Sequence, residues 1–187
     1  WVYMEEILGR ATAYSAFWWS PKSDKVCFLR FDDSPVPDFP IYHADGHHGE
    51  LEHQRYPKAG DANPYVKFGI ANLPDGQAGV ADGKITWADF DEKADQYVAW
   101  PTWTKDNKLT VQWMNRAQDN IIIYWIDTNT GKKTELYNEK QKEWVEWFED
   151  LYFFDNNSGF LLKSNVDGWD HLYYYDLSGK LKKRLTQ

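Results

Sequence analysis

The chain has 187 residues, of which 18% are aromatic and 27% are charged, and its net charge is −8. No apolar run approaches the length that a bilayer requires, so the sequence predicts no membrane span, and the charged fraction argues against disorder. Lysine and arginine are scattered along the chain instead of clustered, which argues against a nucleic-acid partner.

Residues 1–16 contain two adjacent acids, Glu5 and Glu6. Taken alone, such a pair is most often a solvated feature of a short surface helix. Two neighbouring carboxylates also suit an ammonium group, because its three donors can be accepted in charge-assisted hydrogen bonds. These residues by themselves leave both interpretations open.

Three units with the same order of elements follow. Each opens with an aromatic strand, a polar turn and a second apolar strand; these openings are residues 17–31, 103–114 and 153–163. Later in each unit a strand ends in Asp or Asn with Gly a few residues on, which is hairpin-turn chemistry. These later parts are residues 65–76, 120–137 and 171–186. Each unit therefore predicts four antiparallel strands.

Four-stranded units in tandem are typical of β-propeller blades. We therefore predict an all-β fold, a partial β-propeller of about three four-stranded antiparallel blades, in residues 17–100, 101–143 and 144–187. A blade buries its faces only against neighbouring blades, and three blades do not close a ring. We expect the chain to be part of a larger propeller, with apolar blade faces exposed at both ends.

A long insertion, residues 32–63, interrupts the first unit and is rich in Pro, Gly and His. It is expected to be irregular, and an insertion of this length inside a blade is often functional. Some of its side chains are of the types that bind zinc or nickel, but spacing on a loop without supporting partners favours a solvated loop. These residues are His43, Asp45, His47, His48 and His53.

Motifs that would carry catalysis or hold a cofactor are absent from this sequence. It has no Gly-x-Ser-x-Gly elbow, no phosphate-binding glycine loop and no zincin motif, so we expect no catalytic residue, metal or cofactor. The single cysteine, Cys27, excludes an internal disulfide and lies in an apolar strand. It is expected to be a small buried residue.

Several unusual stretches are distributed over the whole chain. They are Trp1–Glu6 with Ala13–Pro21, Arg55–Phe68, Leu109–Gln118 and Asp167–Asp176. In this order they resemble the dipeptidyl peptidase IV family, and the last is similar to its bacterial members. The resemblance implies an N-terminal propeller joined to a catalytic α/β-hydrolase domain in the same parent chain. Such proteins remove X-Pro or X-Ala dipeptides from peptide substrates with a free N-terminus, using a Ser-Asp-His triad.

The resemblance also implies roles for particular residues. Glu5 and Glu6 match the carboxylates that receive the substrate α-amine, although Met4 stands where the family has a further Glu. Phe148 matches a phenylalanine that lines an extended substrate subsite, and a place in the blade core is an equally good interpretation. The insertion at residues 35–60 occupies the place of an arm used in dimerisation, so a homodimer is expected.

A different function remains open. Some members of the family keep the propeller and lose the triad, so the chain could belong to a non-catalytic binding module. A Gly-Trp-Ser-Tyr-Gly-Gly-like elbow downstream of Gln187 would favour the peptidase. The similarity to bacterial members implies a periplasmic or cell-surface location.

Overall fold

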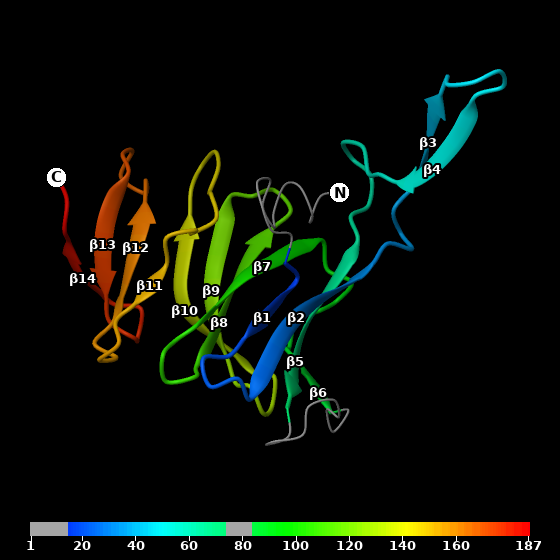
Figure 1. The fold of residues 1–187 in the computed structure, drawn as a ribbon. Coiled ribbons are helices and arrows are strands. Elements are labelled where there is room, and N and C mark those ends of the chain that lie inside the picture. Colours follow the sequence, from blue (N-terminus) through cyan, green and yellow to red (C-terminus); the bar gives the residue numbers. More distant parts are fainter. Residues whose placement is uncertain (1–14, 74–83) are drawn as a thin grey trace.

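The computed structural model describes residues 15–73 and 84–187. All regular elements within these residues are β-strands. Three four-stranded antiparallel sheets stand side by side in chain order, and a hairpin projects from the first (Figure 1). The predicted all-β fold of three blades is confirmed, and the sheets do not close into a ring. None of the described residues form a helix that could span a membrane.

Each sheet is a meander in which every strand pairs with the next strand of its sheet. The first sheet contains β1 (Phe17–Trp19), β2 (Lys25–Asp32), β5 (Tyr65–Asn72) and β6 (Ile85–Trp87). The second contains β7 (Gln96–Trp103), β8 (Leu109–Asn115), β9 (Asn120–Ile126) and β10 (Lys133–Lys140). The third contains β11 (Tyr152–Phe153), β12 (Phe160–Ser164), β13 (His171–Tyr175) and β14 (Leu181–Arg184).

Strand β7 begins at Gln96, so the predicted boundary between residues 100 and 101 falls inside this strand. A bulge between Ala99 and Thr102 interrupts its pairing with β8, and Trp100 in the bulge has a φ of 48°. A bulge shifts the alternation of side chains along a strand. The bulge therefore divides β7 into two stretches with different side-chain patterns. This explains why the sequence places the opening of the second unit at residue 103, at the end of β7.

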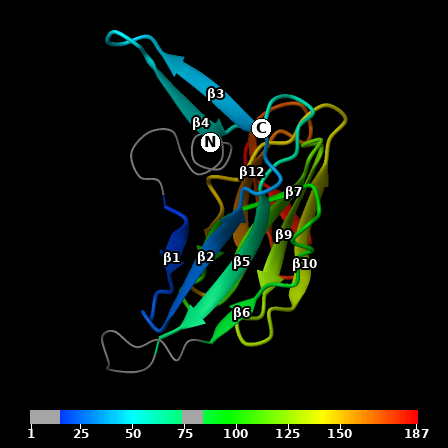
Figure 2. The same ribbon diagram turned by 90° about the vertical axis from the view of Figure 1, so that its right-hand side faces the viewer.

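Residues 38–55 form a hairpin, so the expectation of an irregular loop is wrong for this part of the insertion. Strands β3 (Asp38–His43) and β4 (Glu50–Arg55) pair along their whole length. Pro40 keeps its place in the register opposite His53. Both strands of a two-stranded ribbon are edge strands, where proline is tolerated at positions whose N–H would face away from the partner strand. Figure 2 shows the hairpin extending away from the three sheets.

The core lies between consecutive sheets and is largely aromatic where the second and third sheets meet. The rings of Trp125 and Phe153 lie 5.3 Å apart, and those of Tyr137 and Tyr175 lie 4.9 Å apart. In the first sheet Cys27 is fully buried, as expected. Burial raises the pKa of its thiol to about 12, so the reactive thiolate does not form at neutral pH.

The first and third sheets also carry exposed apolar side chains, as predicted for blades without a neighbour on one side. Phe17 and Trp19 on β1 are 55% and 56% exposed, and Leu172 and Leu181 in the third sheet are 38% and 49% exposed. In a propeller such faces are covered by adjacent blades. This exposure agrees with three sheets that form one section of a propeller.

A repeated turn at the end of the first hairpin in each sheet links neighbouring blades. Its residue with positive φ is Ser23, Asn107 or Asn157. Asn107 Nδ2 donates a hydrogen bond to Asp24 Oδ1 at 3.0 Å, and Lys105 Nζ donates to Asp155 at 2.6 Å. The bond from Asn107 is the main cause that holds the pKa of Asp24 below its ordinary value.

Replacing Asn107 with alanine is expected to destabilise the fold by about 1–2 kcal/mol at neutral pH, because alanine at positive φ is strained and Asp24 loses a donor. The pKa of Asp24 in the folded protein lies below the ordinary value of 3.8, so the Asp24 contribution to stability is present above that value. It is lost as the pH falls through the folded pKa. The difference in the free energy of unfolding between wild type and variant, measured with urea, should therefore become smaller in acid, where only the strain at positive φ is left.

The matched control for this prediction is Asn129→Ala, in an exposed turn of the second sheet. It should change the free energy of unfolding by no more than about 0.5 kcal/mol at any pH. A difference between wild type and the Asn107 variant that stays constant from neutral to acid pH would contradict the link to Asp24.

A second repeated turn docks each sheet on the one before it. Gly131, between β9 and β10, and Gly179, between β13 and β14, have φ values of 77° and 81°. A Cβ atom on Gly131 would lie 1.9 Å from the carbonyl oxygen of Trp87, and one on Gly179 would lie 1.8 Å from that of Leu136. Both turns thus place a glycine against the last strand of the preceding sheet, where no side chain fits.

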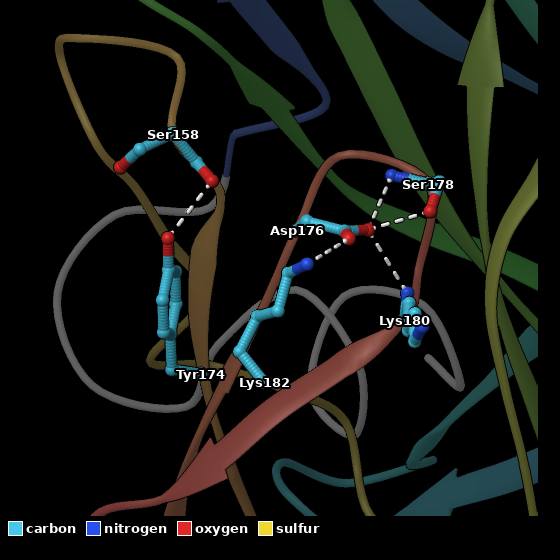
Figure 3. A network of polar contacts seen from close by, with 6 residues as sticks. All are labelled: Ser158, Tyr174, Asp176, Ser178, Lys180 and Lys182. Atoms are coloured by element: carbon cyan, nitrogen blue, oxygen red, sulfur yellow. Dashed lines mark hydrogen bonds and ion pairs between the residues drawn. The ribbon is translucent and has the colours of Figure 1, made fainter.

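Asp176 holds the turn that contains Gly179 (Figure 3). Its Oδ1 accepts hydrogen bonds from N and Oγ of Ser178, at 2.9 and 2.6 Å, and from N of Lys180 at 3.1 Å. Its Oδ2 lies 3.0 Å from Nζ of Lys182. Ser178 and then Lys182 contribute most to lowering the pKa of Asp176. The side chain thus fixes both flanks of the glycine.

Candidate functional site

A cavity of about 330 Å³ lies where the second and third sheets meet. Its walls come from β8 and the turn after it, from β10, from β12 and the turn after it, and from residues 144–150 between β10 and β11. The volume lies within the range of sites that take small ligands or parts of peptides. This cavity is the candidate functional site in the described part of the chain.

Residues 144–150 line the cavity without forming a strand, and they are held by two buried apolar side chains. Val145 is 1% exposed and Phe148 is 6% exposed, whereas Trp144 is 54% exposed. The backbone N–H of Val145 donates to the carbonyl of Gln118 at 2.8 Å. The residues that flank the two anchors are therefore the ones presented to a ligand.

The structure places Phe148 in the core and in the cavity wall at the same time. Its ring packs edge-on against Tyr137, with the ring centroids 5.7 Å apart. Its backbone N–H and carbonyl are both bonded to the side chain of Gln112. The burial agrees with the interpretation as blade core, and the position in the wall is compatible with a contact to an extended substrate.

Glu139 is a carboxylate on the cavity wall that is only 4% exposed. Its Oε2 accepts hydrogen bonds from Tyr137 and Ser164, each at 2.7 Å, and its Oε1 accepts one from Gln141 at 2.6 Å. Burial is the main cause that raises the pKa of Tyr137, which stays protonated as a donor. This hydrogen-bond network connects β10 to β12 and fixes the positions of Glu139 and Ser164 in the cavity wall.

The lining of the cavity is acidic and aromatic. Its carboxylates are Glu139, Glu146, Glu149, Asp150 and Asp170. The lysine of the lining, Lys163, lies 3.8 Å from Asp170. The indoles of Trp144 and Trp147 add aromatic surface. Such a lining suits an apolar or cationic side chain of a peptide, because a cation is attracted both by carboxylates and by the face of an indole.

The other residues that the sequence singled out lie elsewhere. Glu5 and Glu6 fall outside the described residues. His43 pairs with Glu52 at 2.8 Å and His53 with Asp38 at 2.7 Å, across the hairpin. The exposed turn residues are Asp45, His47 and His48. Within residues 15–73 and 84–187, no three His, Cys, Asp or Glu side chains are grouped so that they could hold a metal.

Four residues of the site were not expected from the sequence: Gln112, Tyr137, Glu139 and Ser164. Gln112 offered one signal, because a polar side chain at the centre of the apolar strand Leu109–Met114 must find partners if it is buried. Glu139 and Ser164 are 25 positions apart. Their contact depends on how two blades dock, which local pattern does not show.

The three docked meanders define this chain as a section of a β-propeller domain. All of residues 1–187 match the family described as "Dipeptidyl peptidase IV (DPP IV) N-terminal region". The chain therefore belongs to the dipeptidyl peptidase IV family, as its sequence motifs indicated.

Individual relatives agree with this assignment. Prolyl endopeptidase FAP of Bos taurus is 29% identical over 187 residues, covering 93% of this chain and 24% of that protein. Inactive dipeptidyl peptidase 10 of Rattus norvegicus is 30% identical over 146 residues, covering 78% of this chain and 18% of that protein. The crystal structure of Porphyromonas gingivalis dipeptidyl peptidase 4 covers 100% of this chain with a TM-score of 0.83 and 29% identity. The chain spans 26% of that structure and similarly little of the other two relatives.

Proposed function

We propose that the protein that carries this chain is a serine exopeptidase that removes X-Pro or X-Ala dipeptides from peptide N-termini. This chain is its substrate-recognition part, and the Ser-Asp-His triad belongs to an α/β-hydrolase domain elsewhere in the same protein. The observation that carries the proposal is the family match over the whole of residues 1–187, which includes the Glu pair. Membership of the family alone does not fix the reaction, so the activity needs a direct test.

In this proposal Glu5 and Glu6 accept the hydrogen bonds of the substrate α-ammonium. A pair of carboxylates at a fixed distance from the nucleophile admits substrates with two residues before the scissile bond. It rejects blocked N-termini, because they leave the carboxylates desolvated and unpaired. The cavity that contains Phe148 is the extended subsite in this proposal, and it receives a large side chain on the first residue of the substrate.

The test is dipeptide release from a Gly-Pro chromogenic substrate by the full-length protein. We expect release of the chromophore from the free-amine substrate and none from the N-acetylated substrate, because only the first carries the ammonium group. Liquid chromatography of the products from an X-Pro peptide would show whether a dipeptide leaves. A protein that binds such peptides and cleaves none of them would refute the proposal.

The alternative is a non-catalytic binding module. The specific observation in its favour is the similarity to inactive dipeptidyl peptidase 10, which matches this chain as well as the other relatives do in percentage identity. The residues downstream of Gln187 discriminate between the two functions. A Gly-Trp-Ser-Tyr-Gly-Gly-like elbow would favour the peptidase, since the serine of such an elbow is the nucleophile.

We also propose that the hairpin β3–β4 contacts a second copy of the protein. Tyr42 and Leu51, which face each other across the hairpin, are 66% and 55% exposed. Apolar side chains on a projecting ribbon favour contact with a partner. Sedimentation of the full-length protein with both residues changed to serine tests this contact.

We also propose a periplasmic or cell-surface location, which cell fractionation would test.

A further inference from the structure

Gln112 connects two segments that are far apart in the sequence. It lies in the middle of β8 and is 1% exposed. Its Nε2 donates to the carbonyl oxygen of Phe148 at 3.0 Å, and its Oε1 accepts from the backbone N–H of Phe148 at 2.9 Å. Both ends of one amide therefore bind both backbone groups of one residue.

These two hydrogen bonds replace the backbone pairing that a neighbouring strand would supply. Residues 144–150 form no strand, and a buried backbone N–H or carbonyl that lacks a partner is strongly disfavoured. The segment is otherwise held at Val145, whose N–H bonds to Gln118. Two points thus fix the segment, one near its start and one at Phe148.

The position of Phe148 determines where its neighbours in the wall lie. Trp147 and Glu149, on either side of it, both line the cavity, and their backbone is continuous with the two groups that Gln112 binds. If the amide were lost, Phe148 and its neighbours could move relative to β8. Displacements of about 1 Å in a binding wall are enough to change how a substrate is held.

We propose that Gln112 is a positioning residue that sets the wall of the cavity and thereby the selectivity for the first residue of the substrate. This inference rests on the proposed peptidase function. The residue that sets the selectivity is then a buried side chain of β8 that does not line the cavity but binds the backbone of Phe148, which does. A substrate whose first residue is large reaches the wall, and one whose first residue is glycine does not.

Gln96 offers a matched control in the same sheet. It is 4% exposed, and its amide likewise binds on both ends, to the carbonyl of Asp91 and to Nε1 of Trp113. None of these three residues lines the cavity. Replacing Gln96 should lower the free energy of unfolding, because buried hydrogen bonds are lost as they are at Gln112. The cavity wall formed by residues 144–150 should stay in place.

The experiment compares Gln112→Met and Gln96→Met with wild type in the full-length protein. The ratio of kcat/KM for Phe-Pro and Gly-Pro chromogenic substrates reports selectivity, and the melting temperature reports stability. Both variants should melt at lower temperature. The ratio should change by about tenfold, through KM of the Phe-Pro substrate, for Gln112→Met alone.

The outcomes separate this inference from the proposed function. An active wild type whose ratio is unchanged by Gln112→Met would show that Gln112 is only structural, and the peptidase proposal would stand. A wild type that cleaves neither substrate would overturn both. If Gln112→Met does not fold, Gln112→Asn keeps a buried amide and shortens its reach by one methylene, and the same ratio decides.

Discussion

Replacement of both Glu5 and Glu6 with alanine is expected to lower kcat/KM for a Gly-Pro chromogenic substrate by about 100- to 1,000-fold, roughly 3–4 kcal/mol. The loss is large because the substrate α-ammonium would leave water and find no charged acceptors. Each charge-assisted hydrogen bond contributes more than a neutral one. Initial rates of the full-length protein, measured below KM, give the ratio directly.

The stability of the double variant should stay close to that of wild type, because its expected role is in binding the substrate. Glu50→Ala, which removes an exposed acid from β4, is the matched control and should leave kcat/KM unchanged. If the double variant cleaves as fast as wild type, the family assignment survives and the amine site lies elsewhere. If it loses activity together with its folded structure, the single variants decide, since each removes one acceptor.

The sequence predicted the blades well because their pattern is local. An aromatic strand, a polar turn and an Asp-to-Gly hairpin recur in every unit, and each of these features reflects backbone conformation that neighbouring residues determine. The hairpin at 38–55 was missed for the opposite reason. No residue of these strands is fully buried, so they lack the strong alternation of buried and exposed side chains, and ion pairs such as His43–Glu52 cross between the strands.

The candidate site was only partly predictable for a related reason. Phe148 was named through the family resemblance, yet its ring lies against Tyr137 and its backbone against Gln112. Gln112 is 36 positions away from Phe148. Contacts of this kind depend on how consecutive blades dock, so no spacing in the sequence identifies them. What the sequence does show is that Gln112, a polar residue in an apolar strand, needs a hydrogen-bond partner if it is buried.

Blade docking also sets the second large effect. Replacing Gly179 with alanine is expected to destabilise the fold by about 2–5 kcal/mol, the sum of strain at positive φ and of overpacking. The added Cβ would lie 1.8 Å from the carbonyl oxygen of Leu136, a backbone atom of the neighbouring sheet that cannot rotate away. Either the turn leaves its hydrogen bonds to Asp176 or the third sheet moves off the second. Urea unfolding of the full-length protein, followed by tryptophan fluorescence, measures the change.

Gly168 separates the two contributions. It also has positive φ, 98°, but a Cβ atom there would meet nothing within 4 Å. Gly168→Ala should therefore cost about 1–2 kcal/mol, the strain alone. Gly131→Ala, which would clash with the carbonyl of Trp87, should resemble Gly179→Ala. Equal effects at all three glycines would show that only backbone conformation matters and that the turns do not dock the sheets. A larger effect at Gly131 and Gly179 would instead show that the close backbone contact between consecutive sheets requires a residue without a side chain.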